Sequence, residues 1–312
     1  MSLSLKSVRM INNYIHKLGL GTVQFGLDYG VSNFSGQTAT ADVREILQCA
    51  LLNDIKTIDT ASTYGTSEDV IGKFNNDNQT YNIVTKTIPI GKKEIQTGDL
   101  QKVRSGVLTS LKRLKQDWLY GLLFHHANDL KAKNGDVLYR CISDFKSDGI
   151  VLKIGVSVYS LEDIDFILSH FDIDLIQIPM NVFDQRLLHC GALKRLQKAG
   201  VEIHVRSAFL QGLVFMDPKD LPDNFQRYSG HISKFHEVIN QLGISPAGAS
   251  LAFLMQQPEI DKVICGVNSL KQFQDLIKTV SNLPDVENDI FDGFVIDDEL
   301  FLNPSNWKEI YR

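Results

Sequence analysis

The chain has 312 residues, of which 43% are hydrophobic, and its formal net charge is −5. This composition supports a packed core and excludes intrinsic disorder, and the mild negative charge gives no reason to expect nucleic acid or an anionic membrane as partner. No apolar run approaches the ~20 residues of a transmembrane helix.

Strand and helix signals alternate along the chain. Apolar runs predict the strands, and apolar residues at helical spacing predict the helices. The strands are expected at 16–25, 56–61, 81–87, 119–125, 151–157, 175–179, 202–207 and 262–267. The helices are expected at 38–53, 67–74, 99–116, 135–148, 160–170, 187–199, 231–242, 246–256 and 270–280. Ser245 is the expected N-cap of the helix that begins at Pro246, and a long connection precedes residue 229.

Eight strand–helix units in a row favour a closed (β/α)8 TIM barrel, since this fold takes about 250 residues. The alternative is a doubly wound open sheet, but no G-x-G-x-x-G motif opens the first helix. No linker rich in Pro, Gly or Ser divides the chain. We therefore predict a single domain over 1–312, with about 1–15 as an N-terminal extension and about 283–312 as a C-terminal tail.

Four polar side chains fall at or just after neighbouring strand ends. Asp59 closes the second predicted strand, Lys86 the third and His125 the fourth, and Tyr64 lies on the turn after Asp59. Taken singly, the aspartate is explained as a helix cap, the lysine as a solvated rim residue and the tyrosine as a half-buried aromatic. Because the C-terminal strand ends of a barrel converge on one face, the four together predict a site for proton chemistry.

Motifs along residues 16–281 resemble the aldo-keto reductases. They are Gly-Leu-Gly-Thr at 19–22, Asp-Thr-Ala-x-x-Tyr-Gly at 59–65, Ser-Glu-x-x-Ile-Gly at 67–72, Thr-Lys at 85–86, Gly-Val-Ser at 155–157, Gln-x-Pro-x-Asn at 177–181 and Gln-Gly-Leu at 211–213. The resemblance implies an oxidoreductase that reduces aldehydes or ketones with NADPH, or less often NADH, inside such a barrel.

The resemblance also implies a catalytic tetrad without a metal. Tyr64 would give a proton to the carbonyl oxygen as hydride reaches the carbon. Lys86 would lower the pKa of Tyr64, Asp59 would pair with Lys86, and His125 would orient the carbonyl group.

The resemblance to this family also implies which residues contact the cofactor. Ser157 and Gln177 would bind the nicotinamide carboxamide, and residues 207–212 would contact the diphosphate through their backbone. The full set of expected cofactor residues is Gly21, Thr22, Asp59, Ser157, Gln177, Arg206, Ser207, Leu210, Gly212, Gly266, Asn268, Gln272 and Asp275.

The chain departs from the family pattern in the cofactor region. Val158 stands where the family usually has Asn, and Arg206 replaces the ring that often stacks on the nicotinamide. No Arg lies in 266–272, where the family commonly grips the 2′-phosphate, and Lys271 is the one nearby cation. The cofactor preference is therefore open between NADP(H) and NAD(H).

Phe25 and His126 are the expected substrate-pocket residues. Alternation along the strand is expected to send the side chains of His125 and His126 opposite ways. Aromatic and hydrogen-bonding groups in the surrounding loops suit a sugar-like small carbonyl or alcohol substrate. The sequence makes no prediction of the oligomeric state.

Two other functions are weighed against reduction. One is a cofactor-binding regulatory protein with little turnover, as in the potassium-channel β-subunits. The other is a metal-dependent hydrolase on His125 and His126, which lacks further ligands at other strand ends. Four scattered cysteines without a CxxC pair indicate free thiols, and hence a reducing cytoplasm.

Overall fold

The computed structural model describes residues 14–33, 35–75 and 81–309, and in it eight parallel strands close into a barrel. Each strand pairs with the next along the chain, and the first pairs with the last. The strands are β1 (Leu18–Gly21), β2 (Thr57–Asp59), β3 (Asn82–Lys86), β4 (Leu119–Phe124), β5 (Val151–Ser157), β6 (Leu175–Pro179), β7 (Glu202–Arg206) and β8 (Lys262–Gly266). The predicted (β/α)8 barrel is confirmed.

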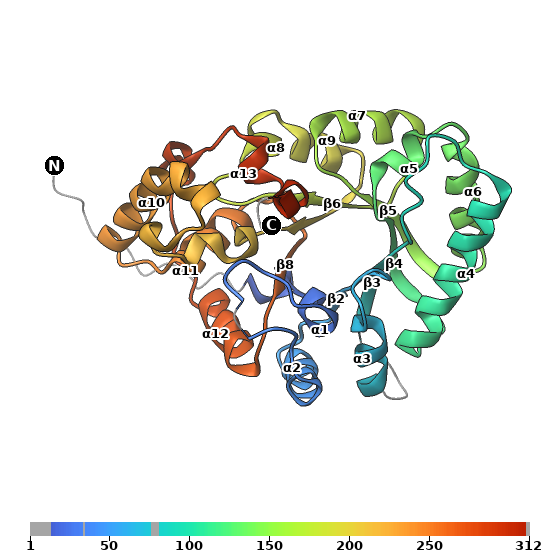
Figure 1. Ribbon diagram of the computed structural model, residues 1–312, viewed down its shortest axis with the longest axis horizontal. Helices are drawn as coiled ribbons and strands as arrows, with labels where there is room; N and C mark the ends of the chain where they lie inside the picture. Colours follow the sequence, from blue (N-terminus) through green and yellow to red (C-terminus); the bar gives the residue numbers. More distant parts are fainter. Residues whose placement is uncertain (1–13, 34, 76–80, 310–312) are drawn as a thin grey trace.

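Helices lie outside the ring of strands (Figure 1) and cover it with their apolar faces. They are α2 (Thr40–Leu52), α3 (Ser67–Phe74), α4 (Thr97–Leu114), α6 (Gly135–Ser147), α7 (Leu161–His170), α10 (Ser229–Gln241), α11 (Pro246–Met255) and α12 (Leu270–Ser281). The predicted cap of α11 is confirmed, because the Ser245 hydroxyl accepts a hydrogen bond from the Gly248 amide.

Two local predictions are wrong, and one short helix was missed. The first strand stops at Gly21 and is flanked by a 3₁₀ turn, η1 (Tyr14–Lys17), and a short helix, α1 (Val23–Gly26). The helix expected at 187–199 is broken into α8 (Arg186–His189) and α9 (Ala192–Lys198), because Gly191 between them has φ +73°. Another short helix, α5 (Ala127–Lys131), was not predicted.

The long connection after β7 and the C-terminal tail pack against one another. The connection contains η2 (Leu210–Phe215), η3 (Pro218–Asp220) and η4 (Asp223–Tyr228), and the tail contains η5 (Asn288–Phe294), α13 (Glu299–Leu302) and η6 (Pro304–Glu309). Phe225 contacts the rings of both Phe301 and Trp307 at centroid distances of 5.8 and 4.9 Å. The predicted tail is thus packed against the barrel domain, whereas most of the predicted N-terminal extension, 1–13, lies outside the described residues.

No single helix in the described ranges is long and apolar enough to cross a bilayer. One pair, Asp223–Gln241 with Pro246–Met255, meets the length and composition criteria together but is bent by 90°.

A half-buried polar cluster lies toward the N-terminal ends of β4, β5 and β7, opposite the predicted site. The Glu202 carboxylate accepts hydrogen bonds from the Tyr120 hydroxyl (2.7 Å) and from Lys153, and pairs with His204 Nε2 at 2.6 Å. Burial alone would raise the pKa of Glu202, but the partners His204 and Lys153 outweigh burial and lower the pKa to about 2.

We predict that Glu202 stabilises the fold in a pH-dependent way. Because its pKa falls from about 4.5 to about 2 on folding, the contribution is fully present above pH 4.5 and is lost as the pH falls toward 2. Glu202→Gln should therefore cost on the order of 2–3 kcal/mol of unfolding free energy at pH 7, and less at pH 3.5. Urea unfolding at both pH values measures this, with the exposed Glu237→Gln as control. An equal cost at both pH values would contradict the assignment.

Candidate active site

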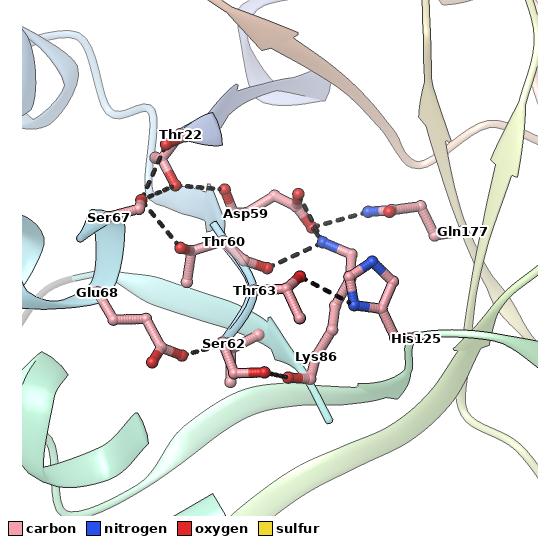
Figure 2. Close-up of polar contacts among 11 residues, drawn as sticks. Thr22, Asp59, Thr60, Ser62, Thr63, Ser67, Glu68, Lys86, His125 and Gln177 are labelled. Atoms are coloured by element: carbon pink, nitrogen blue, oxygen red, sulfur yellow. Dashed lines mark hydrogen bonds and ion pairs between the residues drawn. The ribbon is translucent and has the colours of Figure 1, made fainter. Parts of the chain in front are cut away.

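A buried ion pair links the ends of β2 and β3. The Lys86 ammonium lies 2.8 Å from both carboxylate oxygens of Asp59 and donates to the Thr60 carbonyl oxygen at 2.9 Å. From β6, the Gln177 amide donates to the same carboxylate at 2.7 Å. Figure 2 shows the ammonium and the amide meeting at the Asp59 carboxylate. The charge of Lys86 is thus balanced locally by Asp59.

Tyr64 is held on the turn after β2 by two glycines. A Cβ on Gly26 would lie 1.8 Å from the Tyr64 carbonyl oxygen, and Gly65 adopts φ +54° against the Gly26 backbone. This close approach of two backbones requires glycine at both positions. The resulting turn sets the Tyr64 ring centroid 5.1 Å from the Lys86 ammonium.

The pKa of Tyr64 differs from the expectation. Burial, and then the negative charge of Asp59, raise the pKa of Tyr64 above its usual range, whereas Arg206 acts in the lowering direction. Burial and Asp59 thus outweigh the lowering of this pKa that was predicted from Lys86, whose ammonium is paired with Asp59. Tyr64 therefore keeps its proton at neutral pH, as a proton donor must.

His125 follows β4 directly and faces Tyr64. The two rings lie edge to face with centroids 6.2 Å apart, and the Thr63 hydroxyl is 3.4 Å from His125 Nδ1. Burial, with the charge of Lys86 adding to it, lowers the pKa of His125 to about 3. The imidazole is therefore neutral near pH 7. Thr63 was not singled out from the sequence, although it lies directly before Tyr64.

The structure differs from the sequence-based expectation in the ring direction of His126 and in the position of Phe25, whereas His126 stays a predicted substrate-pocket residue. The rings of His125 and His126 do not point opposite ways but stack, with centroids 4.9 Å apart, because β4 ends at Phe124 and strand alternation no longer applies. His126 is exposed and occupies the N-cap position of α5 without a side-chain capping bond. Phe25 is completely buried in the core, since α1 turns its side chain inward. It has no open surface with which to contact a substrate.

Ser157 and Gln177 are brought side by side at the ends of β5 and β6. They are register partners, and the Gln177 carbonyl oxygen accepts from the Val158 amide. The Gln177 side chain is fully buried, and its Oε1 has no hydrogen-bond partner among the described residues. A buried acceptor without a donor is costly, so this atom fits the NH₂ of a nicotinamide carboxamide.

The loop after β7 is strained in the way that anion-binding loops are. Four of its residues have φ in the left-handed region: Ser207 (62°), Leu210 (44°), Gln211 (53°) and Gly212 (94°). Each non-glycine residue of this kind costs about 1–3 kcal/mol, and such strain gathers at functional sites. The Gln211 carbonyl oxygen also accepts from the Val31 amide, which ties the loop to the segment after α1. Turns that pass through the left-handed region gather backbone amides into concavities that suit a diphosphate.

The adenosine side of the expected cofactor site lies between β1, β8 and α12. Gly21 and Gly266 are register partners, and the buried Thr22 donates its hydroxyl to the Asp59 carbonyl oxygen. The side chain of Gln272 accepts from the Asn268 amide at 2.7 Å.

Two of the three charged residues of α12 form an ion pair. Lys271 and Asp275 form an exposed ion pair at 3.1 Å. Asp275 was expected to contact the cofactor, yet in the structure its carboxylate holds the only nearby cation predicted from the sequence.

Arg206 ends β7 and stacks on an aromatic ring that the sequence analysis missed. Its guanidinium carbon lies 4.2 Å from the Tyr159 ring centroid, and its Nη2 donates to the Val158 carbonyl oxygen at 3.1 Å. The sequence could have indicated Tyr159, because it lies two positions after the Gly-Val-Ser motif that predicts the end of a strand.

Comparison with known proteins agrees with this geometry. The family model described as the aldo/keto reductase family matches residues 17–296. Two curated relatives from Bacillus subtilis, the uncharacterized oxidoreductases YqkF and YrpG, are each 24% identical, over 86% and 89% of this chain and 92% and 93% of their own lengths.

Solved structures show the same fold. Aldo-keto reductase AKR11C1 from Bacillus halodurans, in its holo form, has a TM-score of 0.70 at 18% identity, with 89% of this chain and 90% of that chain covered. The thermostable aldo-keto reductase Tm1743, in complex with the inhibitor epalrestat, has a TM-score of 0.65 at 23% identity, with 89% and 94% covered.

We predict strong coupling between Asp59 and Lys86. Asp59→Asn leaves a buried ammonium without its counter-charge and should cost about 3–5 kcal/mol of unfolding free energy. Lys86→Met in the same chain should recover part of this loss, because the buried cation is then gone. A double-mutant cycle in urea at pH 7 measures the coupling. Additive costs, agreeing within about 0.5 kcal/mol, would show that the two groups do not depend on each other.

Proposed function

Because the chain belongs to the aldo/keto reductase family and is an oxidoreductase, we propose that it reduces an aldehyde or ketone to an alcohol with NAD(P)H. Tyr64 is the proton donor in this proposal. The observation that carries it is the placement of a protonated Tyr64 between the neutral His125 and the Asp59–Lys86 pair at one face of the barrel. Members of this family typically depend on NAD(P)H.

The residues of the cleft fit such a cofactor. Ser157 and the unpaired Oε1 of Gln177 would hold the carboxamide, and the strained loop 207–212 would hold the diphosphate. When bound, NAD(P)H supplies the hydride that reaches the carbonyl carbon. Asp59 was expected to contact the cofactor. In the proposal it acts instead through Lys86 and Gln177, which already bond to its carboxylate.

The side chains divide the remaining chemistry among them. The Tyr64 hydroxyl donates a proton to the carbonyl oxygen, and the phenolate formed is stabilised by the Lys86 ammonium near its ring. His125 Nε2 donates a hydrogen bond to the same oxygen in the tautomer that leaves Nδ1 to accept from the Thr63 hydroxyl. The raised pKa of Tyr64 keeps the hydroxyl protonated at neutral pH but makes it a weak acid, so the proton moves only as hydride transfer builds negative charge on the carbonyl oxygen.

The substrate we propose is a small, hydroxylated carbonyl compound such as a sugar aldehyde. Exposed His126 beside His125 offers a hydrogen-bonding group to the part of the substrate next to the carbonyl. All four cysteines are free, and free thiols are typical of a reducing compartment, so we place the activity in the cytoplasm.

Tyr64→Phe tests the proposed proton donor. The variant should fold and bind NAD(P)H as the wild type does, but lose about 10²–10⁴-fold in kcat, because only the acidic hydroxyl is removed. Steady-state reduction of an aldehyde panel, with Tyr139→Phe on α6 as the matched control, measures the effect. Full activity in Tyr64→Phe would refute the assignment. Cofactor binding without any wild-type turnover would instead indicate a regulatory protein.

We also propose that NADPH is preferred over NADH by a modest factor or not at all. A 2′-phosphate brings about two negative charges, and selection for it needs cations in charge-assisted hydrogen bonds. The nearby Lys271 is paired with Asp275, and Asn268 and Gln272 are uncharged.

Gln272→Arg should therefore shift the preference toward NADPH by roughly 1.5–3 kcal/mol if the new bonds form well. Gln272→Leu is the control, since it removes the bond to the Asn268 amide without adding charge. Dissociation constants for both reduced cofactors, from quenching of protein fluorescence, give the preference. A wild-type preference for NADPH of about a hundredfold or more would contradict the proposal.

A further inference from the structure

The charges around the reactive centre do not sum to zero. Lys86 and Asp59 cancel as a buried pair. Burial lowers the pKa of both His125 and His126, so neither ring is charged at neutral pH, and Tyr64 keeps its proton. The positive charge that remains belongs to Arg206, and it acts electrostatically on Tyr64, Lys86 and both histidines.

Arg206 has only neutral partners in the part of the chain that the structure describes. Its guanidinium contacts the Tyr159 ring, the Val158 carbonyl oxygen and, at 3.5 Å, the Ser207 hydroxyl. No carboxylate of the described residues forms an ion pair with it. Asp129, a buried acid near His126, instead accepts from the backbone amides of residues 90 and 91. Arg206 is therefore held in a half-buried position without a direct ion-pair partner among the described residues.

This charge lies on the wall where the nicotinamide ring is expected. Arg206 is the register partner of Pro179, two residues beyond Gln177 on β6. The Val158 carbonyl oxygen accepts from the guanidinium, while the amide of the same residue donates to the Gln177 backbone. The guanidinium is thus bonded to the residue next to Ser157, and its strand, β7, pairs with the strand of Gln177.

Oxidised and reduced nicotinamide cofactors differ by one positive charge on that ring. Their diphosphate, riboses and adenine are the same, so every other contribution to affinity cancels in a comparison of the two. A unit charge a few ångströms from the ring, in a site screened less than bulk water, repels the oxidised form and leaves the reduced form unaffected.

We propose that Arg206 makes this site select the reduced cofactor over the oxidised one, so that the protein loads NAD(P)H even when NAD(P)⁺ is in excess. The inference rests on the proposed function. The preference for the reduced form helps the protein to bind NAD(P)H and to release NAD(P)⁺ quickly. It also makes the bound cofactor a weaker hydride donor. Tighter binding of the reduced form raises the potential of the bound couple by about 30 mV for each tenfold difference in affinity.

The test compares dissociation constants of NADH and NAD⁺ for the wild type, Arg206→Gln, Arg206→Met and Arg206→Lys. Calorimetry or competition against NADH fluorescence supplies both constants, and circular dichroism checks folding. In the wild type, NAD⁺ should bind at least about tenfold more weakly than NADH. The two neutral variants should lose about tenfold or more of this ratio, whichever of them folds better, and Arg206→Lys should retain most of it.

Three results would overturn the proposal in distinguishable ways. An unchanged ratio in the neutral variants would show that Arg206 does not discriminate, while leaving the reductase function intact. A ratio in Arg206→Lys equal to that of the neutral variants would show that charge is not the cause. Failure of the wild type to bind either NADH or NADPH would reject both this inference and the proposed function.

Discussion

The structure of the site depends on one buried ion pair, between Asp59 and Lys86. Taking two charges out of water costs several kcal/mol each, and only close mutual contact with further hydrogen bonds repays that cost. Here Lys86 makes three contacts of 2.8–2.9 Å, and Gln177 supplies another donor to the carboxylate. The pair consequently fixes the ends of β2, β3 and β6 relative to one another. Tyr64 is placed against this framework, so its chemistry depends on the same contacts.

The barrel could be predicted from the sequence because its signal is repeated eight times. Apolar strand runs and amphipathic helices report burial directly, and each unit constrains its neighbours. Short elements were missed because they depend on local turns: Gly191 breaks a helix that looks continuous, and the chain bends into α1 directly after β1. Phe25 was misplaced for that reason. His126 was misjudged because strand alternation was extended one residue beyond the end of β4.

The members of the site were predicted, but not how they interact. Motif spacing identified Asp59, Tyr64, Lys86 and His125, since strand ends of a barrel converge. It did not show that Tyr64 is buried beside Asp59, and burial, followed by the Asp59 charge, raises the pKa of Tyr64. Charge pairing and pKa values depend on burial and on the distances between side chains of different strands. The same holds for Arg206, whose neutral surroundings became visible only once β5, β6 and β7 were assembled.

We propose above all that hydride passes from a nicotinamide cofactor to a carbonyl carbon at this face of the barrel. The most direct measurement uses NADH and NADPH fully deuterated at C4 with a panel of aldehydes, ketones and sugars, and mass spectrometry of the alcohols formed. We expect one deuterium on the carbinol carbon of at least one product. Turnover that yields alcohol without deuterium, or no alcohol from any carbonyl with either cofactor, would contradict it.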